Sequence, residues 1–287
     1  MASHYSIEEL EKKANEIRQD IITMLVKAKS GHSAGPLGMA DIFTALYFRV
    51  LKHDPKNPLW KERDRLILSN GHICPVRYVA MAHAGYYSKE LLGTFRQIGS
   101  LLEGHPSIKK IPALETSSGP LGEGLSQACG FAMASRMDGT QNAHHVWCIT
   151  SDGEHDEGMT WEAAMFAGKN RLTNLTLIID RNNIQIDGYT EDIMPLEPLR
   201  EKYESFGWHV EDINGNDMAQ IITTLEEAKA TGEKPVCIIA HTMPGKGVEF
   251  MEKDPKRFEW HGITPNEEQG KEALRELRTL EGKIEEA

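Results

Sequence analysis

Short apolar runs that alternate with helix-like segments constrain the fold of this chain most strongly. Residues 146–150 (VWCIT) and 175–180 (LTLIID) have the length and composition of buried strands, and residues 159–170 between them have the pattern of a helix. A strand, a helix and a second strand in this order form a β-α-β unit with parallel strands. The pattern therefore predicts an α/β fold.

The same alternation continues on both sides of this unit. Residues 65–69 (RLILS) predict an earlier strand. Residues 208–213 and 235–242 predict two later strands, separated by a helix over residues 217–230 that Asp217 caps. Buried strands that alternate with helices are typical of a doubly wound, mainly parallel sheet with helices on both faces, which is the fold we expect.

Helices are also predicted at the two ends of the chain. Ser6 and Glu9 form a capping box before apolar residues at helical spacing, and Gly31 follows the end of this helix. A second helix is predicted over residues 39–51, and the polar, Glu- and Lys-rich tail over residues 266–287 is helical by composition. Because no low-complexity linker or repeat divides the chain, we expect one domain.

Composition and charge exclude several classes of protein. The formal net charge of −11 argues against a broad basic surface for nucleic acid, and no apolar run approaches the roughly 20 residues of a membrane span. The amino terminus becomes charged before any apolar core develops, so no secretory signal is expected and a cytoplasmic location is predicted. We expect the cysteines, which lack C-x-x-C spacing, to be reduced core residues: Cys74, Cys129, Cys148 and Cys237.

Two polar segments directly follow the strands of the central β-α-β unit. Asp152 and Gly153 belong to SDGEHDEG after the first strand, and Asn182 belongs to DRNNIQIDG after the second. Ligands of open α/β sheets bind outside the carboxyl ends of the strands, so these residues are expected to converge. Mg²⁺ prefers oxygen ligands, and a glycine N–H can approach an anionic diphosphate closely. The simpler interpretation is that both segments are turns.

Four of the 12 histidines adjoin glycine in loop-like contexts: His32, His72, His105 and His261. Each could be an ordinary surface residue. A loop histidine beside glycine can also present its ring to a ligand, where it donates a hydrogen bond or exchanges a proton near neutral pH.

The sequence motifs around these residues resemble those of one family. SDGEHDEG and DRNN resemble the thiamine diphosphate motif of the transketolase and 2-oxo acid dehydrogenase superfamily, with Ser151 in place of the usual first glycine. GHSAGPLGMADI, SNGH, EGHPS, GPLGEG and WHG occur in the order found in transketolase. Ser33 stands where that family often has proline, and Glu123 stands where glutamine is common. The resemblance covers most of the chain.

The resemblance implies a metal site and a substrate site. Asp152, Asn182 and the Ile184 carbonyl would bind Mg²⁺, or Ca²⁺ or Mn²⁺ in its place. The carbonyl and hydroxyl groups of the substrate would be surrounded by four catalytic histidines: His32, His72, His105 and His261.

The resemblance also implies contacts along the whole cofactor. The residues expected to bind thiamine diphosphate are His72, Gly119, Leu121, Asp152, Gly153, Glu157, Asn182 and His261. Gly153, His72 and His261 would contact the diphosphate. The backbone of the Gly119 and Leu121 loop would face the aminopyrimidine. Glu157 would lie at a subunit interface near the pyrimidine, although a glutamate in the first turn of a helix is also favoured by the helix dipole alone.

The implied activity is transfer of a two-carbon ketol unit from a ketose phosphate to an aldose phosphate, as in the pentose phosphate pathway. The resemblance covers only the amino-terminal part of a full-length transketolase, so residues 1–287 are expected to form a single diphosphate-binding domain. A C-terminal subunit with the pyrimidine-binding domain, which carries an essential glutamate in the family, is the expected partner. Two copies of each chain would then form a heterotetramer.

Three alternatives remain at this point. An α subunit of a 2-oxo acid dehydrogenase shares the cofactor motif but supports decarboxylation, and 1-deoxyxylulose-phosphate synthase is a single long chain with its motifs placed differently. A catalytically silent binding or regulatory module is the third. SNGH, GPLGEG and the glycine-flanked histidines favour transketolase.

Overall fold

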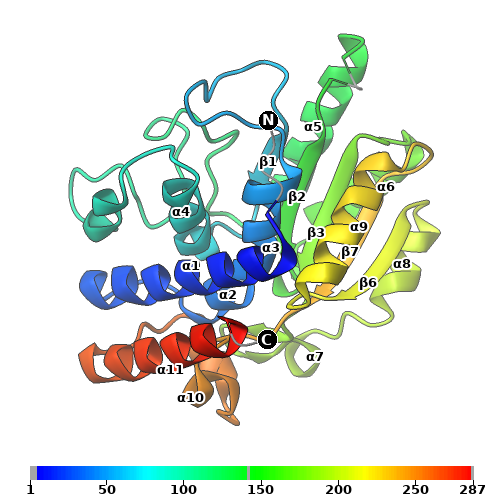
Figure 1. Ribbon diagram of the computed structural model, residues 1–287. Coiled ribbons are helices and arrows are strands. Elements are labelled where there is room, and N and C mark those ends of the chain that lie inside the picture. Colours follow the sequence, from blue (N-terminus) through cyan, green and yellow to red (C-terminus); the bar gives the residue numbers. More distant parts are fainter. Residues whose placement is uncertain (1–4, 141–142, 286–287) are drawn as a thin grey trace.

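A parallel sheet forms the centre of the computed structural model, which describes residues 5–140 and 143–285. The order of its strands is β1-β2-β3-β7-β6, and every neighbouring pair is parallel (Figure 1). The strands are β1 (Arg65–Leu68), β2 (Val146–Ser151), β3 (Leu175–Asp180), β6 (His209–Asn214) and β7 (Val236–His241). A separate antiparallel pair consists of β4 (Ile184–Gln185) and β5 (Gly188–Tyr189). The predicted parallel sheet is therefore confirmed.

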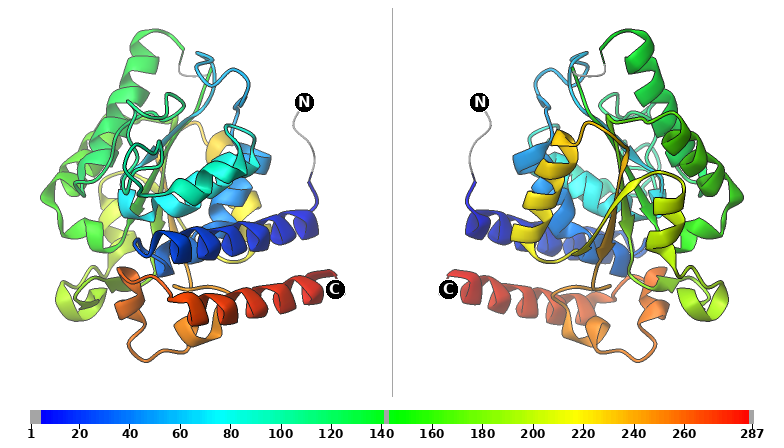
Figure 2. Two further views of the ribbon diagram at one scale, coloured as in Figure 1. Left: turned by 90° about the vertical axis from the view of Figure 1, so that its left-hand side faces the viewer. Right: turned by 90° about the vertical axis from the view of Figure 1, so that its right-hand side faces the viewer.

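Helices cover both faces of this sheet. The α-helices are α1 (Ile7–Ala28), α2 (Ala34–Gly38), α3 (Ala40–Ala45), α4 (Cys74–His83), α5 (Glu123–Met137), α6 (Gly158–Lys169), α7 (Thr190–Ile193), α8 (Leu199–Ser205), α9 (Met218–Ala230), α10 (Glu249–Glu252) and α11 (Glu267–Glu285). Helices α1, α3, α4 and α9 pack into the apolar core on one face, and α5, α6 and α8 pack into a second core on the other (Figure 2). The sheet is doubly wound, as expected.

Shorter helical turns connect these elements. They are the π-helical turn η1 (Leu46–Val50) and the 3₁₀ turns η2 (Gly71–Ile73), η3 (Lys89–Thr94), η4 (Gly153–Asp156) and η5 (Arg257–His261). Three of them, η2, η4 and η5, carry candidate site residues.

Most elements expected from the sequence are present, and the region after α1 is the main difference. The Ser6 and Glu9 capping box and the Asp217 cap of α9 both form. The helix expected over residues 39–51 is instead α3 followed by η1, and the separate helix α2 precedes it. The carboxyl end of α2 is packed closely against the segment after β7, because a Cβ on Gly38 would lie 2.9 Å from the Met243 carbonyl oxygen. Only glycine permits this close approach.

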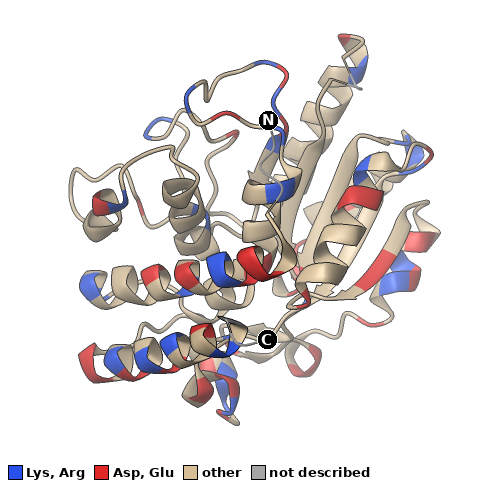
Figure 3. Ribbon diagram, in the orientation of Figure 1, with Lys and Arg blue, Asp and Glu red and all other residues tan. Residues whose placement is uncertain are grey.

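The interior is mainly apolar and most charged side chains lie on the outside, although a few, among them Asp152, Glu154 and Asp180, are buried. All four cysteines are free and buried, as the sequence predicted. Lys, Arg, Asp and Glu alternate along α1 and α11, which lie side by side, whereas α5 carries few charges (Figure 3). Within residues 5–140 and 143–285, no helix combines the length and apolar character of a membrane span.

A buried histidine at the amino-terminal end of the sheet makes stability depend on pH. His145 is 5% exposed, and its Nε2 lies 2.8 Å from Thr176 Oγ1. Burial lowers the pKa of His145 from 6.5 to about 4. The unfolded chain therefore takes up a proton on His145 before the folded chain does as the pH falls. The stability that comes from burying the neutral ring is fully present above pH 6.5 and decreases as the pH falls toward 4.

We expect wild type to lose about 2 kcal/mol more stability than His145→Gln between pH 7 and pH 5, because the variant lacks the titrating ring. Urea unfolding of both proteins at the two pH values measures this difference. Parallel pH profiles for the two proteins would refute the assignment.

Candidate functional site

The predicted metal residues meet where β2 and β3 end. Ser151 and Asp180 are paired in register, so the residues that follow them emerge side by side. Asp152 is fully buried, and its Oδ2 accepts hydrogen bonds from the Asn183 N–H at 2.6 Å and from Arg181 Nη1 at 3.2 Å. The convergence expected from the β-α-β pattern is present.

The turn after β3 contacts Asp152 and carries further polar groups. Asn182 Oδ1 accepts the Ile184 N–H at 3.0 Å, and Asn182 Nδ2 donates to Asp180 Oδ2 at 2.9 Å. Asn183 has φ 62°, a left-handed conformation that asparagine tolerates better than most residues. The β4 and β5 strands begin directly afterwards and fix the far side of the turn.

Two buried carboxylates give this edge of the sheet a negative environment. Burial raises the pKa of Asp152 to about 6, although Arg181 and the N–H groups of Asn183 and Gly153 oppose the rise. Burial also raises the pKa of Asp180 to about 7, and the nearby Asp152 adds to the effect. A cation placed here would offset the cost of burying both negative charges.

The oxygen donors of this turn fit a hard divalent cation. They comprise a carboxylate, a side-chain amide and backbone carbonyls, which are the ligand types that Mg²⁺ accepts together with water and phosphate. Among the described residues, no group of three or more His, Cys, Asp and Glu forms a metal site. An ion bound here would therefore depend on the Asp152 carboxylate together with amide and carbonyl oxygens and the phosphates of a ligand.

Three of the predicted histidines come together from distant parts of the chain. His32 follows α1, His72 lies in η2 after β1, and His261 ends η5. The ring centroid of His72 lies 4.9 Å from those of both His32 and His261, and the remaining pair is 5.5 Å apart. His105 is exposed, and its ring faces the Gly119 loop.

The histidine rings are held in the neutral form. Burial lowers the pKa of His32 and of His261 to about 4, and it lowers the pKa of His72 well below 6.5. A neutral imidazole has one donor and one acceptor nitrogen. The buried Nδ1 atoms of His32 and His261 have no hydrogen-bond partner among the described residues.

Other buried polar atoms, on segments that adjoin or contact the His72 turn, also lack partners. Asn70 Nδ2, Asn70 Oδ1 and Ser118 Oγ have no hydrogen-bond partner within the described part of the chain. Buried polar groups normally form hydrogen bonds, so unpaired ones on the segments around the His72 turn fit a polar ligand. A Cβ on Gly71 would lie 2.5 Å from Ser118 Oγ, so the His72 turn and the Gly119 loop are in direct contact.

The remaining predicted residues lie around these two groups. Leu121 is half-buried in the loop before α5, and Gly153 begins η4 directly after Asp152. A Cβ on Gly153 would lie 3.1 Å from the Gln185 Cβ, so the backbone of Gly153 lies against the β4 strand. Glu157 is the exposed residue before α6, and it packs against Gly122.

Three further residues of this region are not among those predicted from the sequence. Asp180 is the last residue of β3, and the sequence pattern identifies it only as part of a strand. Arg181 follows it and pairs with Asp152. Glu154 lies inside SDGEHDEG and is fully buried. A charged residue inside or next to a strand-end motif is the signal that could have identified each of them.

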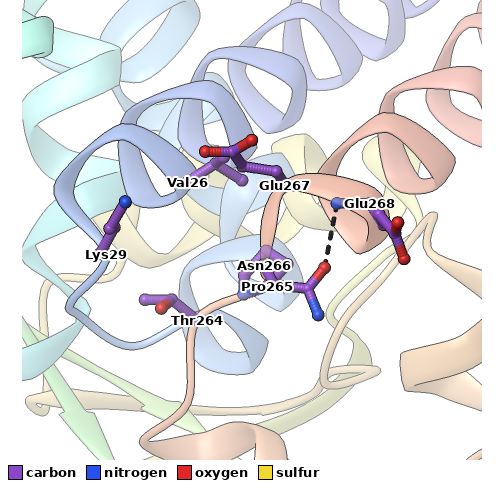
Figure 4. Close-up of a pocket in the computed structure, with 7 residues that line it drawn as sticks. All are labelled: Val26, Lys29, Thr264, Pro265, Asn266, Glu267 and Glu268. Carbon is purple, nitrogen blue, oxygen red and sulfur yellow. Dashed lines mark hydrogen bonds between the residues drawn. The ribbon is translucent and has the colours of Figure 1, made fainter.

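A hollow of about 490 Å³ between α1 and α11 lies apart from the candidate residues (Figure 4). Its lining residues are Val26, Lys29, Thr264, Pro265, Asn266, Glu267 and Glu268. Asn266 Oδ1 accepts the Glu268 N–H at 3.0 Å and so caps the start of α11. This hollow reflects the packing of the last helix on the first.

Comparison with known proteins gives a consistent result. Residues 10–278 match the family model described as the thiamine diphosphate binding domain of transketolase. The chain is 43% identical over 269 residues to the 6-deoxy-6-sulfo-D-fructose transketolase subunit SqwG of Clostridium sp. (strain MSTE9), covering 94% of this chain and 96% of that one. It is 40% identical over 279 residues to an apulose-4-phosphate transketolase subunit of Phocaeicola vulgatus, covering 97% of each.

A solved structure agrees with these relatives. The crystal structure of transketolase from Campylobacter jejuni superposes with a TM-score of 0.87 at 36% sequence identity. The match covers 98% of this chain and 43% of that one. The similarity therefore includes the whole arrangement of sheet, helices and strand-end loops described above.

Proposed function

This chain belongs to the transketolase family through its thiamine diphosphate binding domain, and we propose that it is the diphosphate-binding subunit of a two-chain transketolase. In this proposal residues 1–287 act as one domain that binds thiamine diphosphate and Mg²⁺ and contributes the substrate histidines. With its partner, the subunit transfers a two-carbon ketol unit from a ketose phosphate to an aldose phosphate.

One observation carries the proposal. The Asp152 turn and the histidine cluster are separate groups, and both lie in loops at or beside the carboxyl ends of the strands, where open α/β sheets bind ligands. One group offers oxygen ligands for a cation, and the other offers neutral imidazoles. A diphosphate with an attached reactive ring needs both kinds of contact.

The residues of this chain would hold the cofactor at its metal end. Asp152, Asn182 and the Ile184 carbonyl would bind Mg²⁺, with Ca²⁺ or Mn²⁺ as alternatives, and the Gly153 N–H would donate to the diphosphate. Bound thiamine diphosphate supplies the electron sink for breaking and forming the carbon–carbon bond.

The histidines would serve the substrate. His72 and His261 would contact the diphosphate, and together with His32 and His105 they would orient the carbonyl and hydroxyl groups of the sugar. Because burial keeps the rings of His32, His72 and His261 neutral, each of these three can donate to one oxygen and accept from another.

An apolar surface supports the need for a partner. Helices α5 and α6 form a groove of about 500 Å³ whose rim includes Met133, Met137, Met159 and Phe166. Met137 is 80% exposed and Phe166 is 45% exposed. Contiguous apolar surface of this kind is typical of protein interfaces. The face begins next to Glu157 and the Gly122 loop, so a chain that covers it also borders the expected pyrimidine site.

We propose that the partner is a C-terminal transketolase subunit with the pyrimidine-binding domain, and that two copies of each chain assemble. The names of the two relatives described above as transketolase subunits support a partner chain. The cytoplasmic location, the pentose phosphate pathway and the identity of the sugars stay predictions.

An assay with both chains tests the activity. The purified pair, with Mg²⁺ and thiamine diphosphate, is offered several ketose and aldose phosphates and, separately, several 2-oxo acids. We expect ketol transfer between sugar phosphates and no decarboxylation. Turnover of a 2-oxo acid without ketol transfer would instead favour the dehydrogenase alternative.

A further inference from the structure

Glu154 is a buried carboxylate that the proposed chemistry does not use. Glu154 is 0% exposed, and it lies in η4, two residues after Asp152. Oε1 accepts hydrogen bonds from the Ser69 hydroxyl and, at 2.7 Å, from the Gly122 N–H. Oε2 accepts the Ser151 N–H at 3.2 Å. One hydroxyl and two backbone N–H groups are therefore the partners of this carboxylate.

These three donors belong to three different segments of the candidate site. Ser69 directly follows β1 and precedes the turn that carries His72, and Gly122 directly follows Leu121. Ser151 directly precedes Asp152. Gly122 and Ser151 thus adjoin residues that are proposed to hold the aminopyrimidine and the metal, and Ser69 lies three residues before His72, which is proposed to contact the diphosphate.

A second hydrogen bond extends the network to the start of α5. Ser69 Oγ accepts the Gly124 N–H at 2.9 Å while its hydroxyl donates to Glu154. A Cβ on Gly124 would lie 2.3 Å from the Ser69 Cβ, so the end of β1 and the start of α5 are in very close contact. The amino terminus of α5 also carries partial positive charge, which favours a carboxylate beside it.

The chemistry of the side chain explains why a carboxylate is required. Three donors converge on its two oxygens, and both oxygens of a carboxylate only accept. The amide of glutamine has one oxygen and one NH₂ group, so its NH₂ would face either the Ser151 N–H or the pair of donors at Oε1. A buried donor would then face another donor without an acceptor between them.

We propose that Glu154 is a positioning residue that fixes the three cofactor-binding loops relative to one another. The proposal rests on the proposed cofactor site. Glu154 itself touches neither cofactor nor substrate, and it acts through Ser69, Gly122 and Ser151 on the residues next to them. It therefore sets the affinity of the assembled site for thiamine diphosphate.

Equilibrium binding to the two-chain complex without substrate tests this role. Thiamine diphosphate is titrated with saturating Mg²⁺ by calorimetry, for wild type, Glu154→Gln, Glu154→Ala and Ser69→Ala. We expect the Kd to rise about 10–100-fold for both Glu154 variants, the range found when a residue that orients a metal ligand is lost. Ser69→Ala should shift the Kd in the same direction by less, because two of the three donors remain.

Two further measurements separate positioning from simple loss of stability. Ketol transfer by Glu154→Gln should show a raised apparent KM for thiamine diphosphate, with kcat at saturating cofactor within a few-fold of wild type. The double variant Ser69→Ala/Glu154→Gln should be less impaired than the product of the single effects, because both act on one network. Glu227→Gln on α9 removes the same charge from an exposed site and serves as the control.

Several results would contradict the positioning role of Glu154. A folded Glu154→Gln complex with a wild-type Kd would overturn the proposal, and so would a lowered melting temperature with an unchanged Kd. If both Glu154 variants fail to fold, an unchanged Kd for Ser69→Ala would overturn it. A wild-type complex that binds thiamine diphosphate without ketol transfer contradicts the proposed activity alone, because the Kd comparison remains valid.

Discussion

Asp152→Ala is expected to lower the affinity for thiamine diphosphate in the presence of Mg²⁺ by at least about 100-fold, since even residues that only orient a metal ligand change affinity by 10–100-fold. Asp152 is the only carboxylate among the three proposed ligands. Its removal leaves one amide and one carbonyl oxygen, which are weak ligands for Mg²⁺ without a charged neighbour. Ketol transfer should be lost in parallel. Titration of the two-chain complex measures the binding directly.

Two comparisons make this result specific to the metal. Asp152→Asn keeps the size of the side chain and one oxygen, so it should retain the fold while its dependence on Mg²⁺ concentration moves to higher values. Arg181 also pairs with Glu191 and Glu197, so we expect it to remain paired in both variants. Glu227→Gln should bind like wild type. Unchanged affinity in Asp152→Ala would show that this aspartate is not a metal ligand.

Gly124→Ala is expected to lower the free energy of unfolding by about 3 kcal/mol, at the upper end of what overpacking costs. The added methyl would lie 2.3 Å from the Ser69 Cβ and 2.7 Å from the Ser69 Cα, and the latter is backbone that cannot rotate away. The start of α5 must therefore shift from β1, which also weakens the Ser69 and Glu154 network. Urea unfolding of the purified chain measures the change.

Gly130→Ala provides the matched control on the same helix. A Cβ on Gly130 meets nothing within 4 Å, so only the helix propensity changes. Alanine should stabilise this helix by about 0.5–1 kcal/mol relative to glycine. If the two substitutions had equal effects, the close contact between β1 and α5 would not be the cause.

The sequence predicted those parts of the site that depend on regular structure. Because β2, α6 and β3 form a β-α-β unit, Asp152 and the turn at Asn182 had to emerge at the same edge. This inference needed only strand length, apolar composition and the position of the polar residues. The same reasoning placed the helices on both faces of the sheet.

The contacts between distant segments could not be predicted in this way. Glu154 is 85 residues from Ser69 in the sequence, and no local sequence pattern around either residue indicates that their side chains form a hydrogen bond. The end of α2 at Gly38 lies close to the Met243 carbonyl oxygen, a contact between distant segments that local propensity does not describe. The glycine neighbours of the histidines made them candidates, but only the family resemblance indicated a common site, since segments from different parts of the chain bring the rings of His32, His72 and His261 together.

The central claim is a division of labour, in which this chain holds the metal and diphosphate and a partner completes the site. It is tested most directly by the rate of ketol transfer at a fixed concentration of this chain, with Mg²⁺ and thiamine diphosphate in excess, as the partner chain is added. Without the partner we expect a rate at least about 10³-fold below that of the complete enzyme, because a positioned acid–base group contributes about 10²–10⁴-fold. The rate should then rise to a plateau at one partner per chain. Full activity of a homo-oligomer of this chain alone would contradict the account.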